Sequence, residues 1–245
     1  MNPLLAWNHT IIAHRGASAY APENTLEAFN QAYLRGARWV EFDVMLAACG
    51  TPIVFHDDSL LRTTGQPGCP GDAPYDVLAT YEAGAWFSPF SAGARIPSLE
   101  MVLNFIKATG ISANIEIKPL PLQSKATVEA ALAVVERVFP KGHESLLFSS
   151  FCMESLRHLR AALPQGLLGL LMHDYRSDWE ALVAELNPCT VHLNKDILEP
   201  DLAFKIKRLK KGLLCYTVNT RAEAEACFVL GVDGVFSDYP DLLSR

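Results

Sequence analysis

The sequence predicts an α/β protein built as a TIM (β/α)8 barrel, with a small capping insertion after the second strand. Three observations predict this fold. The chain has 245 residues, a length typical of one such barrel. Short apolar runs alternate with amphipathic helical segments over most of the chain, as in parallel βα units with right-handed crossovers. Eight such runs can be counted, which is the number of strands that closes this barrel.

The composition is that of a globular protein, with 50% hydrophobic and 20% charged residues, and we expect one domain over residues 1–245. A net charge of −6 without a basic stripe argues against a nucleic-acid partner. The six cysteines form no CxxC pair, so neither a zinc site nor a disulfide framework is indicated. No apolar run approaches the ~18 residues that a membrane span needs. We therefore expect a cytoplasmic protein without stable membrane insertion. The sequence is compatible with a homodimer.

The first βα unit begins with a short apolar strand, Ile11 to Ala13, that ends in His14, Arg15 and Gly16. Asn24 followed by Glu27 fits a capping box and predicts a helix over residues 25–35, with Gly36 just beyond its end.

A hairpin is predicted over residues 40–58. Its first strand alternates apolar and acidic residues, so Glu41 and Asp43 point to the same side. Gly50 and its neighbours turn the chain, and residues 53–56 form the returning strand. This pairing would bring His56 level with Asp43.

Between residues 57 and 97 the periodicity is lost, and Gly, Pro, Ser and Thr become frequent. A loop of this length within a compact domain is usually functional, so we interpret it as the capping insertion. Trp86 and Phe87 are candidate pocket walls, although they could equally pin the loop to the core.

Regular alternation follows, and Ser98 is placed to cap the first helix. Helices are predicted over residues 99–109, 123–138, 152–162, 178–186, 199–210 and 221–230, and strands over 114–118, 146–149, 167–171, 190–193, 213–218 and 234–236. An open doubly wound sheet is the alternative architecture, but no glycine-rich dinucleotide loop follows the first strand.

In a barrel, the carboxyl ends of the strands form the site. The residues predicted there are unusually polar: His14, Arg15, Glu41, Asp43, Glu116, Lys118, Ser149, His192, Asn194, Asn219 and Asp238. The three carboxylates of Glu41, Asp43 and Glu116 suit a hard divalent cation such as Mg²⁺ or Ca²⁺. Zinc would favour more nitrogen or sulfur ligands.

Two histidines, His14 and His56, flank the carboxylates and could exchange protons at a phosphodiester, with His56 the acid if His14 is the base. Arg15 and Lys118 add positive charge suited to phosphate oxygens. Each residue alone has a structural explanation, such as a core histidine or an ion pair. All of these residues are predicted at the same end of the barrel. This clustering favours a shared function, because several buried charges without a functional role would only destabilise the fold.

The sequence resembles the glycerophosphodiester phosphodiesterase family, most closely its bacterial cytoplasmic members. The stretches that carry the resemblance, in order, are residues 14–16 (HRG), 22–25 (PENT), 41–44 (EFDV), 54–57 (VFHD), 96–99 (IPSL), 116–118 (EIK), 149–151 (SSF), 216–219 (YTVN) and 234–238 (GVFSD).

This resemblance implies a TIM barrel that hydrolyses glycerophosphodiesters, such as glycerophosphocholine or glycerophosphoethanolamine, to sn-glycerol 3-phosphate and an alcohol. It implies His14 and His56 as the acid-base pair, with either water or the substrate's 2-hydroxyl as nucleophile. It further implies that one divalent ion, Mg²⁺ or Ca²⁺ with Mn²⁺ as a third choice, binds to Glu41, Asp43 and Glu116, and that Arg15 and Lys118 contact phosphate.

The sequence departs from the family pattern at two places. Cys49 stands at the hairpin tip, where relatives often carry a polar residue, and we expect only a surface effect. Asn219 stands where many relatives have Trp, which we expect to change how the glycerol or the leaving alcohol packs. Two alternative functions are a phospholipase-like activity on lysolipids or phosphoinositides, for which no membrane-docking segment is evident, and a barrel that binds a phosphodiester or a metal without turnover.

Overall fold

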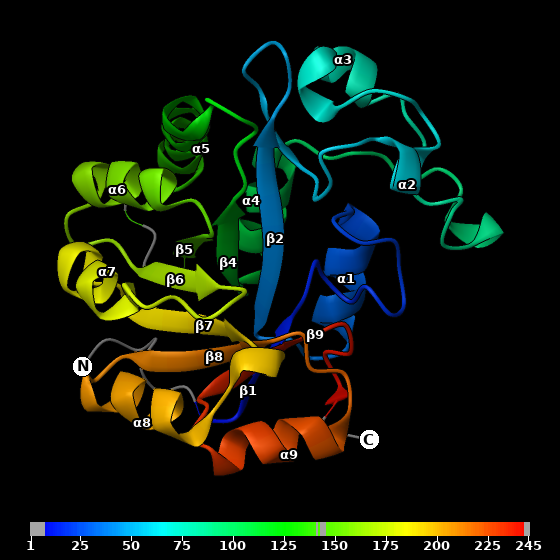
Figure 1. Ribbon diagram of the computed structural model, residues 1–245. Helices are drawn as coiled ribbons and strands as arrows, with labels where there is room; N and C mark the ends of the chain where they lie inside the picture. Colours follow the sequence, from blue (N-terminus) through cyan, green and yellow to red (C-terminus); the bar gives the residue numbers. More distant parts are fainter. Residues whose placement is uncertain (1–7, 141, 143–145, 243–245) are drawn as a thin grey trace.

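The computed structural model describes residues 8–140, 142 and 146–242. Within these residues, eight parallel strands form a closed barrel with helices on its outside (Figure 1). The order around the barrel is β1-β9-β8-β7-β6-β5-β4-β2, and a pairing between β1 and β2 closes the ring. The TIM barrel prediction is therefore confirmed, and the open doubly wound sheet is wrong.

The elements lie where the hydrophobic periodicity predicts them, within about two residues at most ends. The barrel strands are β1 (Thr10–Ala13), β2 (Trp39–Leu46), β4 (Ser112–Ile117), β5 (Leu146–Ser150), β6 (Leu168–Met172), β7 (Thr190–Asn194), β8 (Gly212–Tyr216) and β9 (Gly234–Ser237). The outer helices are α1 (Leu26–Leu34), α4 (Leu99–Thr109), α5 (Ser124–Val138), α6 (Met153–Ala162), α7 (Trp179–Leu186), α8 (Pro200–Arg208) and α9 (Arg221–Val229).

An apolar plug fills the inside of the barrel. Ile12 lies opposite Trp39 on one side and Phe236 on the other, and all three are buried. Leu147 and Leu214 complete this cluster. A larger apolar cluster lies between the strands and the helices. The barrel is thus a packed core, and polar side chains at the carboxyl ends of the strands stand above an apolar floor.

Helix caps explain most of the element boundaries. The Ser98 hydroxyl accepts a hydrogen bond from the Met101 amide, as predicted, and begins α4. The capping box predicted at Asn24 is wrong, because the Thr25 side chain caps α1 instead. Asn24 has a φ of 57° and donates its side-chain amide to Asp43 Oδ2 at 2.8 Å. The Asn24 side chain therefore orients the Asp43 carboxylate and does not cap the helix.

The returning strand of the hairpin, β3 (Pro52–Val54), is shorter than predicted. Val54 pairs with Val44, and the Phe55 amide donates to the Asp43 carbonyl at 3.0 Å. Phe55, and not His56, is therefore level with Asp43, and the chain leaves the ladder one residue earlier than expected. His56 therefore lies outside the strand, and the alternation of strand side chains does not fix its direction.

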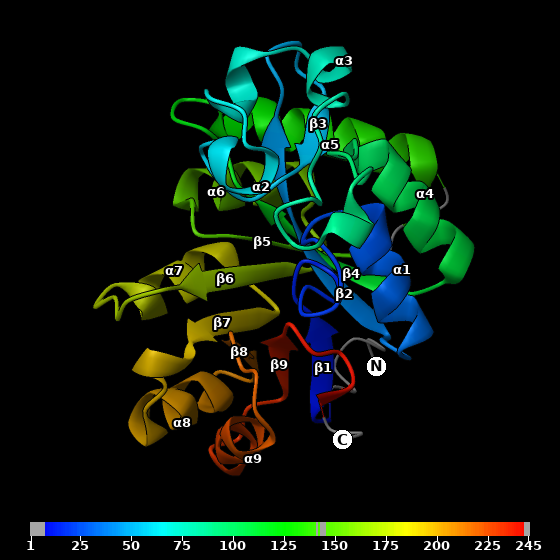
Figure 2. The same ribbon diagram turned by 90° about the vertical axis from the view of Figure 1, so that its right-hand side faces the viewer.

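The predicted insertion covers the end of the hairpin (Figures 1 and 2). It contains short helical turns, which are α2 (Leu61–Thr64), η2 (Pro70–Asp72), α3 (Tyr75–Leu78) and η3 (Pro89–Ser91). A separate apolar cluster, in which Met45 and Phe55 meet Leu78, holds it on the barrel. Trp86 is 42% exposed and donates its indole N–H to the Ala83 carbonyl at 3.0 Å.

No helix in the described part of the chain is long and apolar enough to cross a bilayer.

Candidate active site

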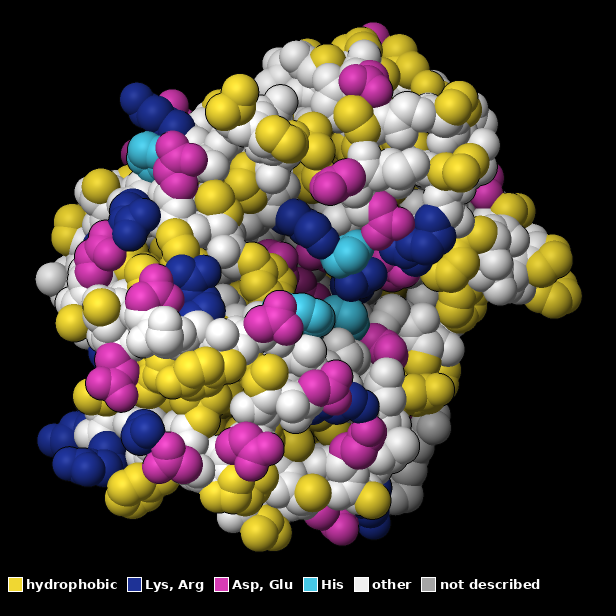
Figure 3. Space-filling model, viewed as in Figure 1, with side chains coloured by type: hydrophobic (Ala, Val, Ile, Leu, Met, Phe, Trp, Pro, Cys, Tyr) yellow, Lys and Arg dark blue, Asp and Glu magenta, His cyan; other side chains and the backbone are white. Residues whose placement is uncertain are grey.

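A cavity of about 480 Å³ opens at the carboxyl ends of the strands. Figure 3 shows it as a hollow in which histidine, acidic and basic side chains meet. Six of the seven predicted site residues line it: His14, Arg15, Glu41, Asp43, His56 and Glu116. Lys118 lies just outside the lining, with its ammonium 4.0 Å from Asp43 Oδ1. Trp86 and Phe87 do not line it, so the interpretation of these rings as its walls is wrong.

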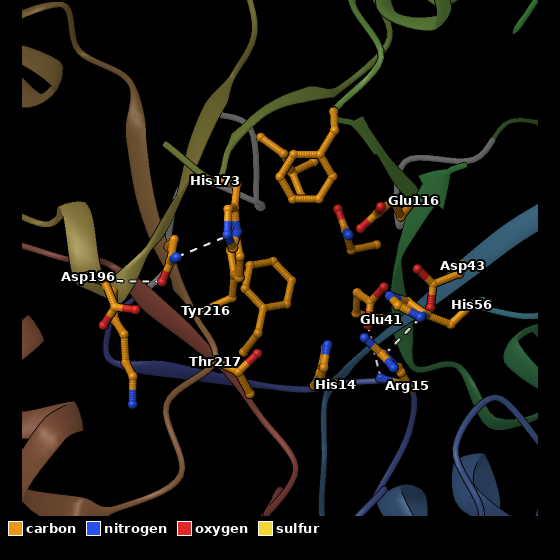
Figure 4. Close-up of a pocket in the computed structure, with 16 residues that line it drawn as sticks. His14, Arg15, Glu41, Asp43, His56, Glu116, His173, Asp196, Tyr216 and Thr217 are labelled. Atoms are coloured by element: carbon orange, nitrogen blue, oxygen red, sulfur yellow. Dashed lines mark hydrogen bonds and ion pairs between the residues drawn. The ribbon is translucent and has the colours of Figure 1, made fainter. Parts of the chain in front are cut away.

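Three buried carboxylates form one side of the cavity (Figure 4). Glu41 and Asp43 come from β2, and Glu116 lies opposite Asp43 on β4. One oxygen from each lies within 4.8 Å of the others. An all-oxygen set of this kind fits a hard divalent cation such as Mg²⁺ or Ca²⁺.

The carboxylates repel one another, which shifts their pKa values apart. Burial and then the charges of Asp43 and Glu116 raise the pKa of Glu41 well above its usual range. Burial, and then Asp43, raise the pKa of Glu116 to about 8. Burial also acts to raise the pKa of Asp43, but Arg15 above all outweighs it, and this pKa is lowered. At neutral pH the group needs protons or a cation for its charge to be balanced.

His14 lies on one side of the carboxylates and is oriented by Asp238, which follows β9. His14 Nδ1 is 2.7 Å from Asp238 Oδ1, and Asn219 donates to Asp238 Oδ2 at 2.6 Å. Burial acts to raise the pKa of Asp238, but the hydrogen bond with His14 outweighs burial and the pKa falls to about 2. Because the ionised carboxylate accepts the Nδ1 proton, Nε2 of His14 is left free for the cavity.

His56 is oriented in the same way by the next residue, Asp57, with His56 Nδ1 2.6 Å from Asp57 Oδ1. Arg62 in α2 donates to Asp57 through two nitrogens, at 2.6 and 2.9 Å. Burial lowers the pKa of His56, and the positive charges of Arg15 and Lys118 lower it further, against the opposing effect of Asp43. The neutral imidazole is therefore favoured.

The loop after β1 brings Arg15 against the carboxylates. Arg15 has a φ of 53°, and its backbone amide donates to Glu41 Oε2 at 2.9 Å. Its guanidinium donates to Glu23 at 2.8 Å and lies 3.7 Å from Asp43, while Nε is buried without a hydrogen-bond partner. Gly16, at φ 82°, lets this loop approach α1, because an added Cβ would lie 2.7 Å from Ala28.

The opposite side of the cavity was largely missed by reasoning from the sequence. Its side chains end or follow β5, β6, β7 and β8, and they are Phe151, His173, Asn194, Lys195, Asp196, Tyr216 and Thr217. Figure 4 shows His173, Asp196 and Tyr216 across the cavity from Glu41 and Asp43. Their position one or two residues beyond a predicted strand end is the sequence feature that could have identified most of them.

Besides Lys118 and Asp238, three polar residues predicted at the strand ends do not line the cavity. His192 is fully buried inside the barrel, bonds to Thr190 at 2.8 Å, and has its pKa lowered to about 3 by burial. Ser149 is buried and accepts from Asn114 at 3.0 Å. Asn219 orients Asp238 through its side-chain amide, and its expected effect on how the glycerol or the leaving alcohol packs stays a prediction.

A closed barrel with its polar residues gathered above the carboxyl ends of the strands defines the class of TIM-barrel enzymes. Within that class, the model of the glycerophosphoryl diester phosphodiesterase family matches residues 14–242. The chain belongs to this family, and it is a phosphoric diester hydrolase.

Relatives in sequence and in structure share most of the chain. A glycerophosphodiester phosphodiesterase from Caldanaerobacter subterraneus is 32% identical over 234 residues, with 95% of each chain covered. A phosphodiesterase from Oleispira antarctica, solved in complex with the product sn-glycerol-3-phosphate, matches with a TM-score of 0.93 and 33% identity, covering 98% of this chain and 97% of that one. A glycerophosphodiester phosphodiesterase from Agrobacterium tumefaciens matches with a TM-score of 0.81 and 26% identity, covering 96% and 99%.

Proposed function

We propose that the enzyme hydrolyses glycerophosphodiesters, such as glycerophosphocholine and glycerophosphoethanolamine, to sn-glycerol 3-phosphate and an alcohol, and that it depends on a divalent cation. The observation that carries this proposal is the pair of imidazoles, each with Nδ1 bonded to a carboxylate, on a cavity that also contains three buried carboxylates. The Oleispira antarctica relative was solved with sn-glycerol-3-phosphate, which supports the same product here.

Glu41, Asp43 and Glu116 would hold the cation, with Mg²⁺ or Ca²⁺ preferred and Mn²⁺ as a third choice. A bound cation supplies Lewis-acid stabilisation of the negative charge that develops at the phosphate. Arg15 contributes a second positive charge, and its Nε, which lies 3.7 Å from Asp43 but makes no hydrogen bond, offers a donor to a phosphate oxygen. Lys118, at the edge of the cavity, adds a third.

The two histidines have complementary roles in this proposal. The lowered pKa of His56 favours the neutral form, which can accept the proton of the attacking hydroxyl through Nε2. His14, oriented by its bond to Asp238, then protonates the leaving oxygen. The sequence alone left open which histidine is the acid and which is the base. The attacking hydroxyl is that of water or of the substrate's own C2 position.

The test is a product assay with purified enzyme and glycerophosphocholine, before and after chelation. We expect release of glycerol 3-phosphate, loss of at least about a hundredfold in rate on chelation, and recovery when Mg²⁺, Ca²⁺ or Mn²⁺ is restored. Unchanged turnover after complete metal removal would contradict the metal dependence. Binding without any product would contradict hydrolysis. The cytoplasmic location, the homodimer and the lack of a nucleic-acid partner stay predictions from the sequence.

A further inference from the structure

The wall of the cavity opposite the carboxylates has a chemistry of its own. We propose that this wall, formed by Phe151, His173, Asn194, Asp196 and Tyr216, is a head-group subsite that selects a cationic amino alcohol over a neutral polyol. The inference rests on the proposed hydrolysis of glycerophosphodiesters and specifies which of these diesters the enzyme prefers.

Two aromatic rings provide the surface for a cation. Phe151 is 41% exposed although it lines the cavity, and it meets Tyr216 edge to face at 5.9 Å. The Tyr216 hydroxyl donates to the Met172 carbonyl at 2.9 Å. This bond fixes the Tyr216 ring and uses its only hydrogen-bond donor. Tyr216 therefore contributes mainly its aromatic ring to the lining of the cavity. Aromatic faces attract quaternary and primary ammonium groups through their quadrupole.

The charges on this wall favour the same ligand. Asp196 lines the cavity, and within the described residues no hydrogen bond or ion pair neutralises its carboxylate. The neighbouring Lys195 is already paired with Glu223, which also caps α9. A cation entering this side therefore meets an available carboxylate, whereas an anionic head group would meet repulsion.

Hydrogen bonds also orient Asn194 and His173 on this wall. The Asp196 amide donates to Asn194 Oδ1 at 3.1 Å, so the Asn194 amide nitrogen is directed to His173 Nδ1, at 3.5 Å. Because that nitrogen is a donor, His173 Nδ1 is the acceptor in this contact. The two sides of the cavity thus match a zwitterion, with Arg15 and the cation site facing the phosphate and this wall facing an ammonium group.

The test compares kcat/KM for glycerophosphocholine and glycerophosphoglycerol, which share the glycerol phosphate and differ in head-group charge. We expect the wild-type enzyme to favour glycerophosphocholine by about tenfold or more. Asp196→Asn should lower kcat/KM for glycerophosphocholine about threefold to tenfold, and Phe151→Ala about fivefold to thirtyfold, with little change for glycerophosphoglycerol. The Asp196 effect should weaken at high salt, since the carboxylate is exposed.

Matched controls are Asp201→Asn and Phe204→Ala on the outer surface of α8, where Asp201 pairs with Lys205 and Phe204 is 62% exposed. These variants should leave both substrates unaffected. Equal kcat/KM for the two substrates in the wild-type enzyme, or an equal loss for both in the Asp196 and Phe151 variants, would overturn the subsite while leaving the hydrolase intact. Failure to hydrolyse either diester would instead overturn the proposed function itself.

Discussion

Glu23 joins the two sides of the proposed catalytic machinery through a chain of charged hydrogen bonds. It accepts from Arg15 at 2.8 Å and from two nitrogens of Arg62, each at 2.7 Å. Arg62 in turn holds Asp57, which orients His56. Burial acts to raise the pKa of Glu23, but its bonds to the arginines outweigh burial and lower the pKa, so the carboxylate stays ionised.

Glu23→Gln should therefore lower kcat about tenfold to a hundredfold, because Arg15 and the orientation of His56 lose a shared anchor. The rate of glycerol 3-phosphate release at saturating substrate measures this effect. Glu100→Gln is the matched control, since Glu100 also pairs with an arginine, Arg137, but on the outer helices. Equal activities of the two variants would show that the network around Glu23 does not position catalytic groups.

Asp238 links the site to the stability of the fold. Its pKa of about 2 lies below the ordinary value of 3.8, so its carboxylate stabilises the folded state above pH ~4, and this contribution is lost as the pH falls toward 2. The free energy of unfolding of the wild-type protein should exceed that of Asp238→Asn by about 1–2 kcal/mol near neutral pH. Urea titrations between pH 3 and 7 should show this difference shrinking toward acid pH; a constant difference would contradict the account.

The residues of the site could be predicted from the sequence to different degrees. The carboxylates and both histidines were found because they stand at the ends of recognisable strands. The pairing of His14 with Asp238, 224 residues away, requires the closed barrel and could not be predicted by local patterns. Asp57 was missed as the partner of His56 because neighbouring side chains in a strand point to opposite faces, and the strand in fact ends at Val54.

At the scale of elements, the loop between β1 and α1 depends on one glycine. Gly16→Ala would combine a positive φ with a Cβ placed 2.7 Å from Ala28. We expect it to lower the free energy of unfolding by about 2–4 kcal/mol, from the strained backbone and overpacking together. Chemical denaturation measures this loss, and activity should fall as well because Arg15 precedes the glycine.

Gly36→Ala separates the two causes, because Gly36 also has a φ of 82° but nothing lies within 4 Å of an added Cβ. This variant should lose only about 1 kcal/mol. An equal loss in both variants would mean that contact with Ala28 is unimportant.

The regular elements were predictable because long stretches of alternating or helical periodicity reflect the burial of one face. The helices of the insertion were not, since four residues, as in α2 and in α3, are too few to show a period. They are held by tertiary contacts with Met45 and Phe55 in the hairpin. The wrong cap at Asn24 has a similar cause, because its contact with Asp43 is remote in sequence and outweighs local capping.

At the scale of the whole molecule, the three buried carboxylates belong to the barrel wall itself, on β2 and β4. Binding of Mg²⁺ or Ca²⁺ should therefore raise the free energy of unfolding, by about 2.7 kcal/mol at a cation concentration of 100 Kd. Thermal unfolding with chelator and with added cation measures this change. Glu41→Gln should abolish most of it, while Glu100→Gln should retain it. The absence of any shift in the wild-type protein would contradict a cation site between these strands.

In the proposed mechanism, His14 and His56 carry out proton transfer at a phosphodiester. The most direct measurement is the rate of glycerol 3-phosphate release from glycerophosphocholine by His14→Ala and His56→Ala at saturating divalent cation, with His158→Ala, half-buried on α6, as control. We predict that each site variant loses about a hundredfold to ten-thousandfold in kcat and that the control keeps full activity. Full activity in either site variant would contradict the account.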